Sequence, residues 1–248
     1  MLLQTDNLTV GYDNQAVIKD ICLHIQKGEI VTLIGANGSG KSTILKTIAG
    51  YIEKLGGNIF FAEKDLHSLS RKEKAEKFSV MLTEKIRTEL MSCREVVETG
   101  RYPYTDYFGR LSETDRQAVN DAIQLVDIER FADKDFSQIS DGQRQRVLLA
   151  KAICQQPEIL ILDEPTSYLD IHHKIRFLEV IRKLADEKQT AVLISMHELD
   201  FAQKISDYTV AVKDGKVVHY GTPDIIFTAE NIRTWFDIPQ DLYDKYFA

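Results

Sequence analysis

The chain has 248 residues, 44% of them hydrophobic, and a formal net charge of −7. This length allows a large buried core in one or two domains. The negative charge and the lack of basic runs interleaved with aromatic residues exclude the usual electrostatic surface of a nucleic-acid-binding protein. The three cysteines are far apart and form no C-x-x-C pair, which indicates a reducing compartment. We find neither a signal peptide nor an apolar run that could span a bilayer, and we therefore expect an intracellular protein.

The N-terminal part of the chain shows strand-like patterns. Apolar residues alternate or cluster between turn-forming pairs such as Asp13–Asn14. This pattern predicts β structure over residues 2–10, 16–25, 30–34 and 56–61. We therefore expect an N-terminal β layer.

The segment Gly35–Thr43 fits the pattern G-x-x-x-x-G-K-[ST] at every fixed position. It follows the predicted strand 30–34 and precedes a helical pattern, the setting in which backbone N–H groups and a helix N-terminus surround an anion. Glycines let the backbone approach phosphate oxygens. Lys41 would reach the β- and γ-phosphates, and the Ser42 hydroxyl would be a Mg²⁺ ligand. The motif predicts a nucleoside triphosphate site formed by Gly35, Asn37, Gly38, Ser39, Gly40, Lys41, Ser42 and Thr43.

From about residue 65 to 155 the pattern is helical. Three capping-box sequences, which begin at Ser70, Ser92 and Ser112, mark helix starts. Beyond them short apolar strands alternate with a helix, at residues 159–162, 171–185, 191–195 and 210–218. This alternation indicates a mainly parallel sheet covered by helices. The expected fold is an α/β nucleotide-binding core with an N-terminal β layer and an inserted helical segment.

The predicted strand 159–162 ends in two adjacent carboxylates, Asp163 and Glu164. An aspartate at such a strand end can hold Mg²⁺, usually through a water molecule. The next side chain points the other way, so Glu164 could face the γ-phosphate and polarise a water molecule. An acidic strand end that only faces solvent is the alternative, which the triphosphate motif earlier in the chain disfavours.

Between these motifs, Ile139–Gln143 precedes an amphipathic helix. At this point the chain resembles the ATP-binding subunits of ATP-binding-cassette (ABC) transporters, whose signature is L-S-G-G-Q. Here Ile replaces Leu and Asp141 replaces the first Gly, a change whose effect on ATP affinity is left open. The resemblance implies that Ser140, Gly142 and Gln143 bind the γ-phosphate held by the other subunit of an ATP-sandwiched homodimer. Ser140-x-x-Gln143 is also an ordinary capping box, and the two roles are compatible.

Other family motifs follow in order. Ser167–Asp170 resembles the D-loop, whose Asp170 contacts the partner's phosphate-binding loop. His197 resembles the H-loop histidine, which would hydrogen-bond the γ-phosphate and help to hold Glu164. Tyr12 stands where the family places an aromatic residue that stacks on adenine, although it could equally pack in the core or a turn. The resemblance implies ATP and Mg²⁺ as cofactors, with catalytic roles for Glu164, His197 and Lys41 and metal ligation by Ser42 and Asp163.

One family motif is missing from the sequence. The Q-loop glutamine, which contacts Mg²⁺ and the transporter, should close the predicted strand 78–82, but Thr83 and Glu84 stand there. Either residue could align with it, and both offer an oxygen atom to a metal. We take Glu84 as the candidate metal ligand.

Residues Arg94–Tyr104 resemble the helical stretch of importers for iron chelates (siderophores, haem) and cobalamin; a short helix ended by glycine and a proline turn is the alternative. The resemblance implies an ATP-hydrolysing importer subunit at the cytoplasmic face of the cell membrane. Such a subunit acts with two separate membrane-spanning permease subunits and, indirectly, with a substrate-binding protein, and not with nucleic acid. The cargo touches those partners and is not readable from this chain.

The resemblance covers residues 1–228. It implies a P-loop NTPase (RecA-like) core at 1–82 and 155–228 and a helical subdomain at about 84–154. The C-terminal tail at 229–248 lies outside the resemblance, and we expect it to form a packing helix or a dimer contact. An ATPase of another ABC transporter class is one alternative. A soluble ABC ATPase acting on DNA or ribosomes is a second, although such proteins usually carry coiled-coil insertions, tandem cassettes or basic patches. A metabolic P-loop kinase is a third, and it would lack the signature and His197.

Overall fold

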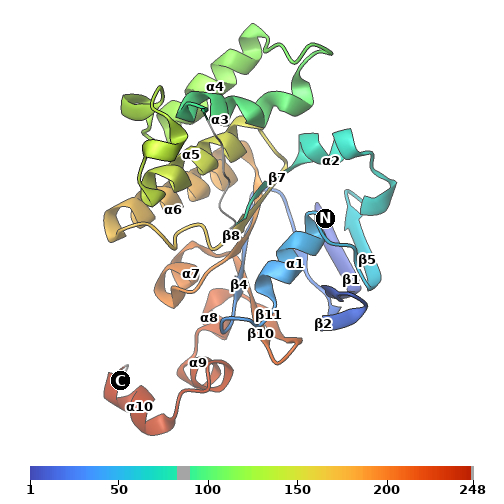
Figure 1. The fold of residues 1–248 in the computed structure, drawn as a ribbon. Coiled ribbons are helices and arrows are strands. Elements are labelled where there is room, and N and C mark those ends of the chain that lie inside the picture. The colour runs from blue at the N-terminus through green and yellow to red at the C-terminus, as the bar shows by residue number, and fades with distance from the viewer. Residues whose placement is uncertain (83–89, 247–248) are drawn as a thin grey trace. The chain divides into compact units, whose positions relative to one another are not determined.

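The computed structural model describes residues 1–82 and 90–246 (Figure 1). The chain divides into two compact units, one made of Met1–Ser68 and Ala191–Ala248 and the other of Leu69–Thr190. Mixed α/β structure is present, as the sequence predicted. The domain boundaries predicted from the family resemblance remain a prediction.

The first unit is built on a mixed sheet. Its strands are β1 (Leu3–Tyr12), β2 (Gln15–Ile21), β3 (His24–Ile25), β4 (Ile30–Ile34), β5 (Gly56–Phe61), β6 (Lys64–Asp65), β9 (Ala191–Ser195), β10 (Tyr208–Lys213) and β11 (Lys216–Gly221). Its α-helices are α1 (Lys41–Ile48), α7 (Leu199–Ile205), α8 (Pro223–Ile226), α9 (Ala229–Trp235) and α10 (Gln240–Tyr246). The strand order is β6-β5-β1-β2-β11-β10-β4-β9.

Strand direction changes across this sheet. β1 pairs antiparallel with β2 and β5, which forms the predicted N-terminal β layer. β4 pairs parallel with both β10 and β9, and all five residues of β4 and of β9 are buried. Strands buried on both faces read as continuous apolar runs, so these two strands match their sequence-based bounds residue for residue. The expected strand 16–25 is interrupted instead: β2 ends at Ile21, and β3 pairs separately with β1.

The second unit combines two parallel strands with a group of helices. Its elements are α2 (Arg71–Lys77), β7 (Phe78–Met81), α3 (Cys93–Glu98), α4 (Glu113–Leu125), α5 (Asp141–Cys154), β8 (Ile159–Asp163) and α6 (Ile171–Lys188), with a 3-10 helix at Thr99–Tyr104. β7 and β8 pair in parallel. The helices α3, α4 and α5 pack on one another and are drawn in green tones in Figure 1.

Helix starts in this unit follow the capping chemistry of the sequence. Ser70, Ser92 and Ser112 each accept a hydrogen bond from the backbone N–H three residues later, while the acidic side chain there accepts from the serine N–H. Such reciprocal caps satisfy two backbone donors that the first helical turn leaves without partners. The three predicted capping boxes are therefore confirmed.

The C-terminal segment packs on the first unit. In α9, Ile232 and Trp235 are buried, and Lys213 Nζ donates to the Thr234 carbonyl at 2.6 Å and to the Asp237 carboxylate. Part of the predicted tail is therefore a packing helix. Within the described residues, no helix is both long enough and apolar enough to cross a membrane.

Candidate nucleotide-binding site

The predicted phosphate loop joins β4 to α1 within the first unit (Figure 1). Gly35, with φ 150°, lies so close to β10 that a Cβ atom there would be 2.3 Å from the Val212 carbonyl oxygen. Gly40, with φ 101°, would bring a Cβ within 2.6 Å of Ile18 Cδ1. Only glycine fits both positions, since each combines a left-handed or strained backbone with a close neighbour. The loop shape is therefore specified by these two residues.

Lys41 lies inside this loop. Its side chain is buried, and Nζ donates to the carbonyl oxygens of Gly35 and Ala36 at 2.9 and 3.1 Å. An ammonium group held by the loop carbonyls is in position to meet an anion bound by the loop N–H groups. The helix N-cap is Gly40, which supplies no capping side chain. The start of α1 thus has the geometry of an anion site.

The other predicted loop residues surround this position. Asn37 and Gly38 are exposed, Ser39 and Ser42 are half-buried, and Thr43 is buried. The N–H of Ser39 donates to the Ala36 carbonyl at 3.2 Å, which closes the turn of the loop. The hydroxyl of Ser42 is a hard oxygen donor at the helix start, the ligand type that Mg²⁺ prefers. These residues fit a bound triphosphate with its metal.

His197 follows β9, the neighbour of β4. The register Leu33–Ser195 and the hydrogen bond from Met196 N to the Leu33 carbonyl, at 3.1 Å, bring the end of β9 beside the start of the phosphate loop. The structure therefore places the His197 segment at the same sheet edge as the loop. Ligands of parallel α/β sheets bind at the carboxyl ends of strands.

Tyr12 lies at the end of β1. It pairs with Gln15 across the β1–β2 turn, and its side chain is 47% exposed. This exposure favours a ring that stacks on a ligand over one that packs in the core.

In the second unit, β8 carries the predicted acidic pair. Asp163 is its last residue and is buried, and Glu164 follows with a left-handed φ of 47°. Left-handed backbone in a residue other than glycine costs about 1–3 kcal/mol and persists where surrounding contacts impose it. Here Ser167 supplies such contacts, because its hydroxyl and N–H both donate to the Glu164 carbonyl at 3.0 and 3.3 Å. The strained turn fixes the direction in which Glu164 leaves the strand.

The predicted signature begins α5. Ser140 Oγ accepts from the Gln143 N–H at 3.2 Å, and Gln143 Oε1 accepts from the Ser140 N–H at 3.0 Å. The capping-box prediction is confirmed. Asp141, which replaces a family glycine, pairs with Arg144 at 2.7 Å on the same helix. Its charge is therefore partly balanced by a cation of its own turn.

The signature and D-loop segments meet within this unit. A Cβ on Gly142 would lie 3.3 Å from the Tyr168 carbonyl and 3.6 Å from Leu169 Cδ2, so the two segments approach closely at this glycine. Asp170 is the N-cap of α6 and accepts from the His173 N–H at 2.9 Å. Hydrogen bonds from the His173 backbone and side chain lower the pKa of Asp170. The carboxylate of Asp170 is accordingly ionised at neutral pH.

Within the stretch Arg94–Tyr104, Gly100 and Arg101 make close contacts with the neighbouring helices. Arg101 is buried and forms an ion pair with Asp115 at 2.8 Å, and it also donates to the Cys154 carbonyl at 2.8 Å. A Cβ on Gly100 would lie 2.4 Å from the Lys151 carbonyl. These contacts connect the segment after α3 to α4 and α5. The sequence of this stretch is therefore explained by packing among the helices of the second unit.

Thr83 and Glu84 lie outside the described residues. Sequence reasoning missed a groove bordered by α4, α5 and α6, because its lining residues come from separate helices and form no linear motif. The charged positions Arg146, Arg176 and Lys183 were the available signal.

These features define an α/β protein with a phosphate-binding loop, and comparisons with known proteins give its family. The ABC transporter family model matches residues 18–167. An uncharacterized ABC transporter ATP-binding protein of Methanocaldococcus jannaschii is 41% identical over 98% of this chain and 84% of its own length. The iron(3+)-hydroxamate import ATP-binding protein of Bacillus subtilis is 34% identical over 97% and 89%. The chain therefore belongs to the ABC transporter family and is an ATP-binding subunit.

A solved structure supports the same assignment. An ATP-binding cassette determined as a dimer in a post-hydrolysis state, bound to ADP and Pi, superposes with a TM-score of 0.80. It is 25% identical, and the match covers 90% of this chain and 99% of that one. The α/β fold predicted from the sequence is confirmed by this likeness.

Proposed function

We propose that this chain is the ATP-hydrolysing subunit of an ABC importer for iron chelates, which acts with separate permease subunits. One observation carries the proposal: a phosphate loop with the backbone geometry of an anion site occurs in a chain similar over nearly its whole length to an iron-hydroxamate import ATP-binding protein. Similarity to a cobalamin import ATP-binding protein of Halobacterium salinarum also supports cobalamin as a cargo, whereas haem is a prediction from the sequence alone.

The residues of each unit have the chemistry that this role needs. In the first unit, Lys41 would pair with the β- and γ-phosphates, Ser42 would hold Mg²⁺, and His197 would hydrogen-bond the γ-phosphate. Tyr12 would stack on adenine. Bound Mg²⁺ would neutralise charge that develops on the phosphates during hydrolysis.

In the second unit, Asp163 would ligate Mg²⁺ through water and Glu164 would polarise the attacking water molecule. Ser140, Gly142 and Gln143 would bind the nucleotide of a second copy, and Asp170 would contact that copy's phosphate loop. Two copies would then close over two ATP molecules. The dimeric cassette to which this chain is similar supports this arrangement.

Closure of such a dimer would use the binding energy of ATP to change the population of permease conformations. Because no described helix could cross a membrane, the membrane-spanning subunits are proposed as separate chains, with this chain peripheral at the cytoplasmic face. A substrate-binding protein would take part indirectly.

An uptake assay tests this proposal. Cells that lack the chain receive either the wild type or Glu164→Gln, and uptake of radioactive iron bound to a hydroxamate chelator is measured, with labelled cobalamin as a second cargo. We expect the wild type alone to restore iron-hydroxamate uptake. Undiminished uptake of both cargoes in cells without the chain would contradict the importer assignment.

A further inference from the structure

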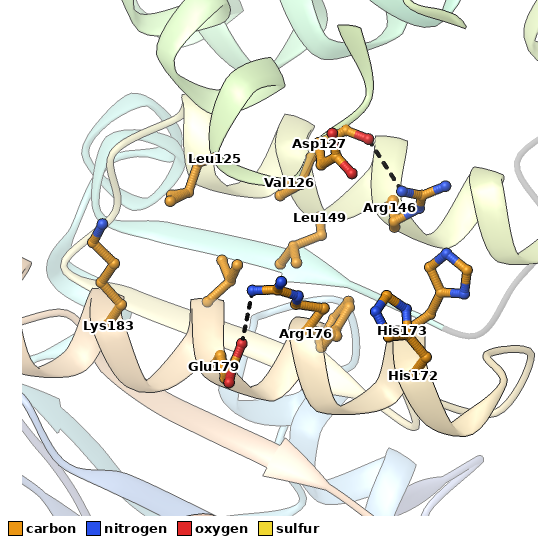
Figure 2. Close-up of a pocket in the computed structure, with 12 residues that line it drawn as sticks. Leu125, Val126, Asp127, Arg146, Leu149, His172, His173, Arg176, Glu179 and Lys183 are labelled. Atoms are coloured by element: carbon orange, nitrogen blue, oxygen red, sulfur yellow. Dashed lines mark hydrogen bonds and ion pairs between the residues drawn. The ribbon is translucent and has the colours of Figure 1, made fainter. Parts of the chain in front are cut away.

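A groove lies within the second unit, between the end of α4, the middle of α5 and the first half of α6 (Figure 2). Its volume is about 440 Å³. Grooves and cavities of roughly 300–1,000 Å³ are the usual size for small-molecule sites. None of the motif residues assigned above to ATP lines it.

The floor of the groove is apolar. Val126, Leu149 and Phe177 are buried among its lining residues, and Leu125 and Val180 are half-buried at its walls. Apolar surface that a ligand covers contributes roughly 25 cal/mol per Å². The groove can therefore hold an apolar body.

The rim carries three cations. Arg146 on α5 and Arg176 on α6 face the groove from opposite helices, and Lys183 lies two helical turns beyond Arg176 (Figure 2). Two carboxylates, Asp127 and Glu179, also line it, but Glu179 pairs with Arg176 at 3.4 Å. Both side chains of this ion pair are exposed, so the pair is weak, and an anionic ligand can replace Glu179 as the partner of Arg176. The arginine and lysine side chains that line the groove therefore outnumber its lining carboxylates by one, and a further carboxylate, Asp170, lies near Arg146 at one end.

Arg146 is the best positioned of these cations. Its Nη1 donates to the Asp127 carbonyl at 3.1 Å, its Cζ lies 5.3 Å from the Phe131 ring centre, and its Nε is buried without a hydrogen-bond partner. A partly buried guanidinium is a strong donor to carboxylate, sulfonate or phosphate groups.

A site for a metal cation is the alternative explanation for the residues at one end of the groove. Ligand atoms of Asp170, His172 and His173 lie within 4.8 Å of one another. However, both carboxylate oxygens of Asp170 lie 2.9 Å from His173 Nδ1. The positive charge of Arg146 and the N-terminal end of α6 also oppose a cation here. Arg146 and this helix end favour an anion, whereas the Asp170 carboxylate disfavours one in direct contact with it.

We propose that this groove binds a small organic anion, with its apolar body on Leu149 and Phe177 and its anionic group beside Arg176, while Lys183 and Arg146 add positive charge at the two ends of the groove (Figure 2). The ligand would touch α5 and α6, the helices that begin at the signature and at Asp170. This site is separate from the proposed nucleotide site and does not depend on the importer assignment.

A pair of fluorescent probes that differ in charge tests the proposal. 1-Anilinonaphthalene-8-sulfonate carries one sulfonate, and N-phenyl-1-naphthylamine is its uncharged parent. Each is titrated into the full chain with a saturating non-hydrolysable ATP analogue, which occupies the nucleotide site. We expect Arg176→Glu/Lys183→Glu to weaken binding of the sulfonate at least about tenfold and binding of the neutral probe by less than about twofold.

The control reverses two cations outside the groove. Arg116→Glu/Lys134→Glu makes the same change of net charge at exposed positions of the same unit and should leave both affinities within about twofold. Circular dichroism monitors folding. If Arg176→Glu/Lys183→Glu unfolds, the neutral variant Arg176→Gln/Lys183→Gln is used in its place. An unchanged sulfonate affinity in the groove variant, or an equal loss in the control, would overturn the proposal.

Discussion

The helices α1 and α5 both begin at a motif predicted to bind phosphate, yet their first turns are built differently. The N-cap of α1 is Gly40, with a left-handed φ of 101° and no capping side chain. The N-cap of α5 is Ser140, in extended backbone, and its side chain and that of Gln143 cap the helix reciprocally. The N–H groups in the first turn of α1 receive no hydrogen bond from a capping side chain, whereas those of α5 are capped by side chains of the same turn.

The two helix starts therefore differ in what they need in order to bind an anion. The phosphate loop is preorganised by Gly35 and Gly40, whose neighbours leave no room for a Cβ. The signature is capped by its own side chains, and the Ser140 hydroxyl that accepts from the Gln143 N–H can still donate its own proton to a phosphate. One such hydrogen bond contributes about 0.5–1.5 kcal/mol. We therefore expect nucleotide binding to depend on α1, and dimer closure on α5.

The largest effect is expected at Lys41. Lys41→Ala removes the buried ammonium group that the loop carbonyls hold and should weaken ATP binding by about 100-fold. Lys46→Ala, on the same helix, is the matched control. The measurement is equilibrium binding of a fluorescent ATP analogue. If Lys41→Ala binds the ATP analogue within about twofold of the wild-type affinity, Lys41 does not pair with the phosphates.

Glu164→Gln should separate binding from hydrolysis. Glutamine has the size of glutamate but cannot polarise water, so ATP affinity should persist while hydrolysis falls at least about 100-fold. Gel filtration with Mg-ATP should then show a trapped dimer. A fully active monomer would contradict both the role of Glu164 and the shared site.

Asp115→Asn tests the buried Arg101–Asp115 ion pair of the second unit through the free energy of unfolding. It leaves Arg101 buried without its carboxylate partner and should destabilise the chain by roughly 3 kcal/mol at neutral pH, as measured by urea denaturation. The matched variant Asp121→Asn changes an exposed acid on the same helix and should change stability by less than about 0.5 kcal/mol.

The pH dependence of that effect has a definite sign. Burial alone would raise the pKa of Asp115, but hydrogen bonds from Ser112 and Arg101 outweigh it, and the pKa is lowered. A carboxylate with a lowered pKa stabilises the fold above its unfolded pKa and loses this contribution as pH falls through the folded pKa. The difference between Asp115→Asn and the wild type should therefore shrink below about pH 4. A difference that stays constant down to pH 3 would contradict this account.

The smallest effect is expected at the position of the missing family glutamine. Glu84→Gln restores a neutral amide, and stronger metal binding by the carboxylate is opposed by repulsion from the γ-phosphate. Hydrolysis should stay within about tenfold of the wild type, and Glu84→Ala should reduce transport more than ATPase activity. Parallel Thr83→Ala and Glu84→Ala variants, assayed for both activities, decide which residue couples. No change in either variant would exclude a coupling role for this loop.

Local chemistry made much of the fold predictable. The strands β4 and β9 are almost entirely apolar in sequence. The capping serines at 70, 92, 112 and 140 each pair with the residue three positions later, so both partners are visible in the sequence. The strained backbone of Glu164 and the close approach of Gly142 to Tyr168 were not predictable, because tertiary contacts impose them. The groove beside α6 depends on residues from three helices, and no periodic pattern connects them.

In the proposed ATP-sandwiched dimer, each nucleotide lies between the start of α1 of one subunit and the start of α5 of the other. Ser140→Arg should therefore block hydrolysis while leaving ATP binding by the single subunit intact. Mixing Ser140→Arg with Lys41→Ala tests this arrangement most directly. In a mixed dimer, both lesions fall on one composite site and the other site is intact, so up to about a quarter of wild-type ATPase activity should return at equal concentrations. A mixture as inactive as each variant alone, with mixed dimers shown to form, would contradict the account.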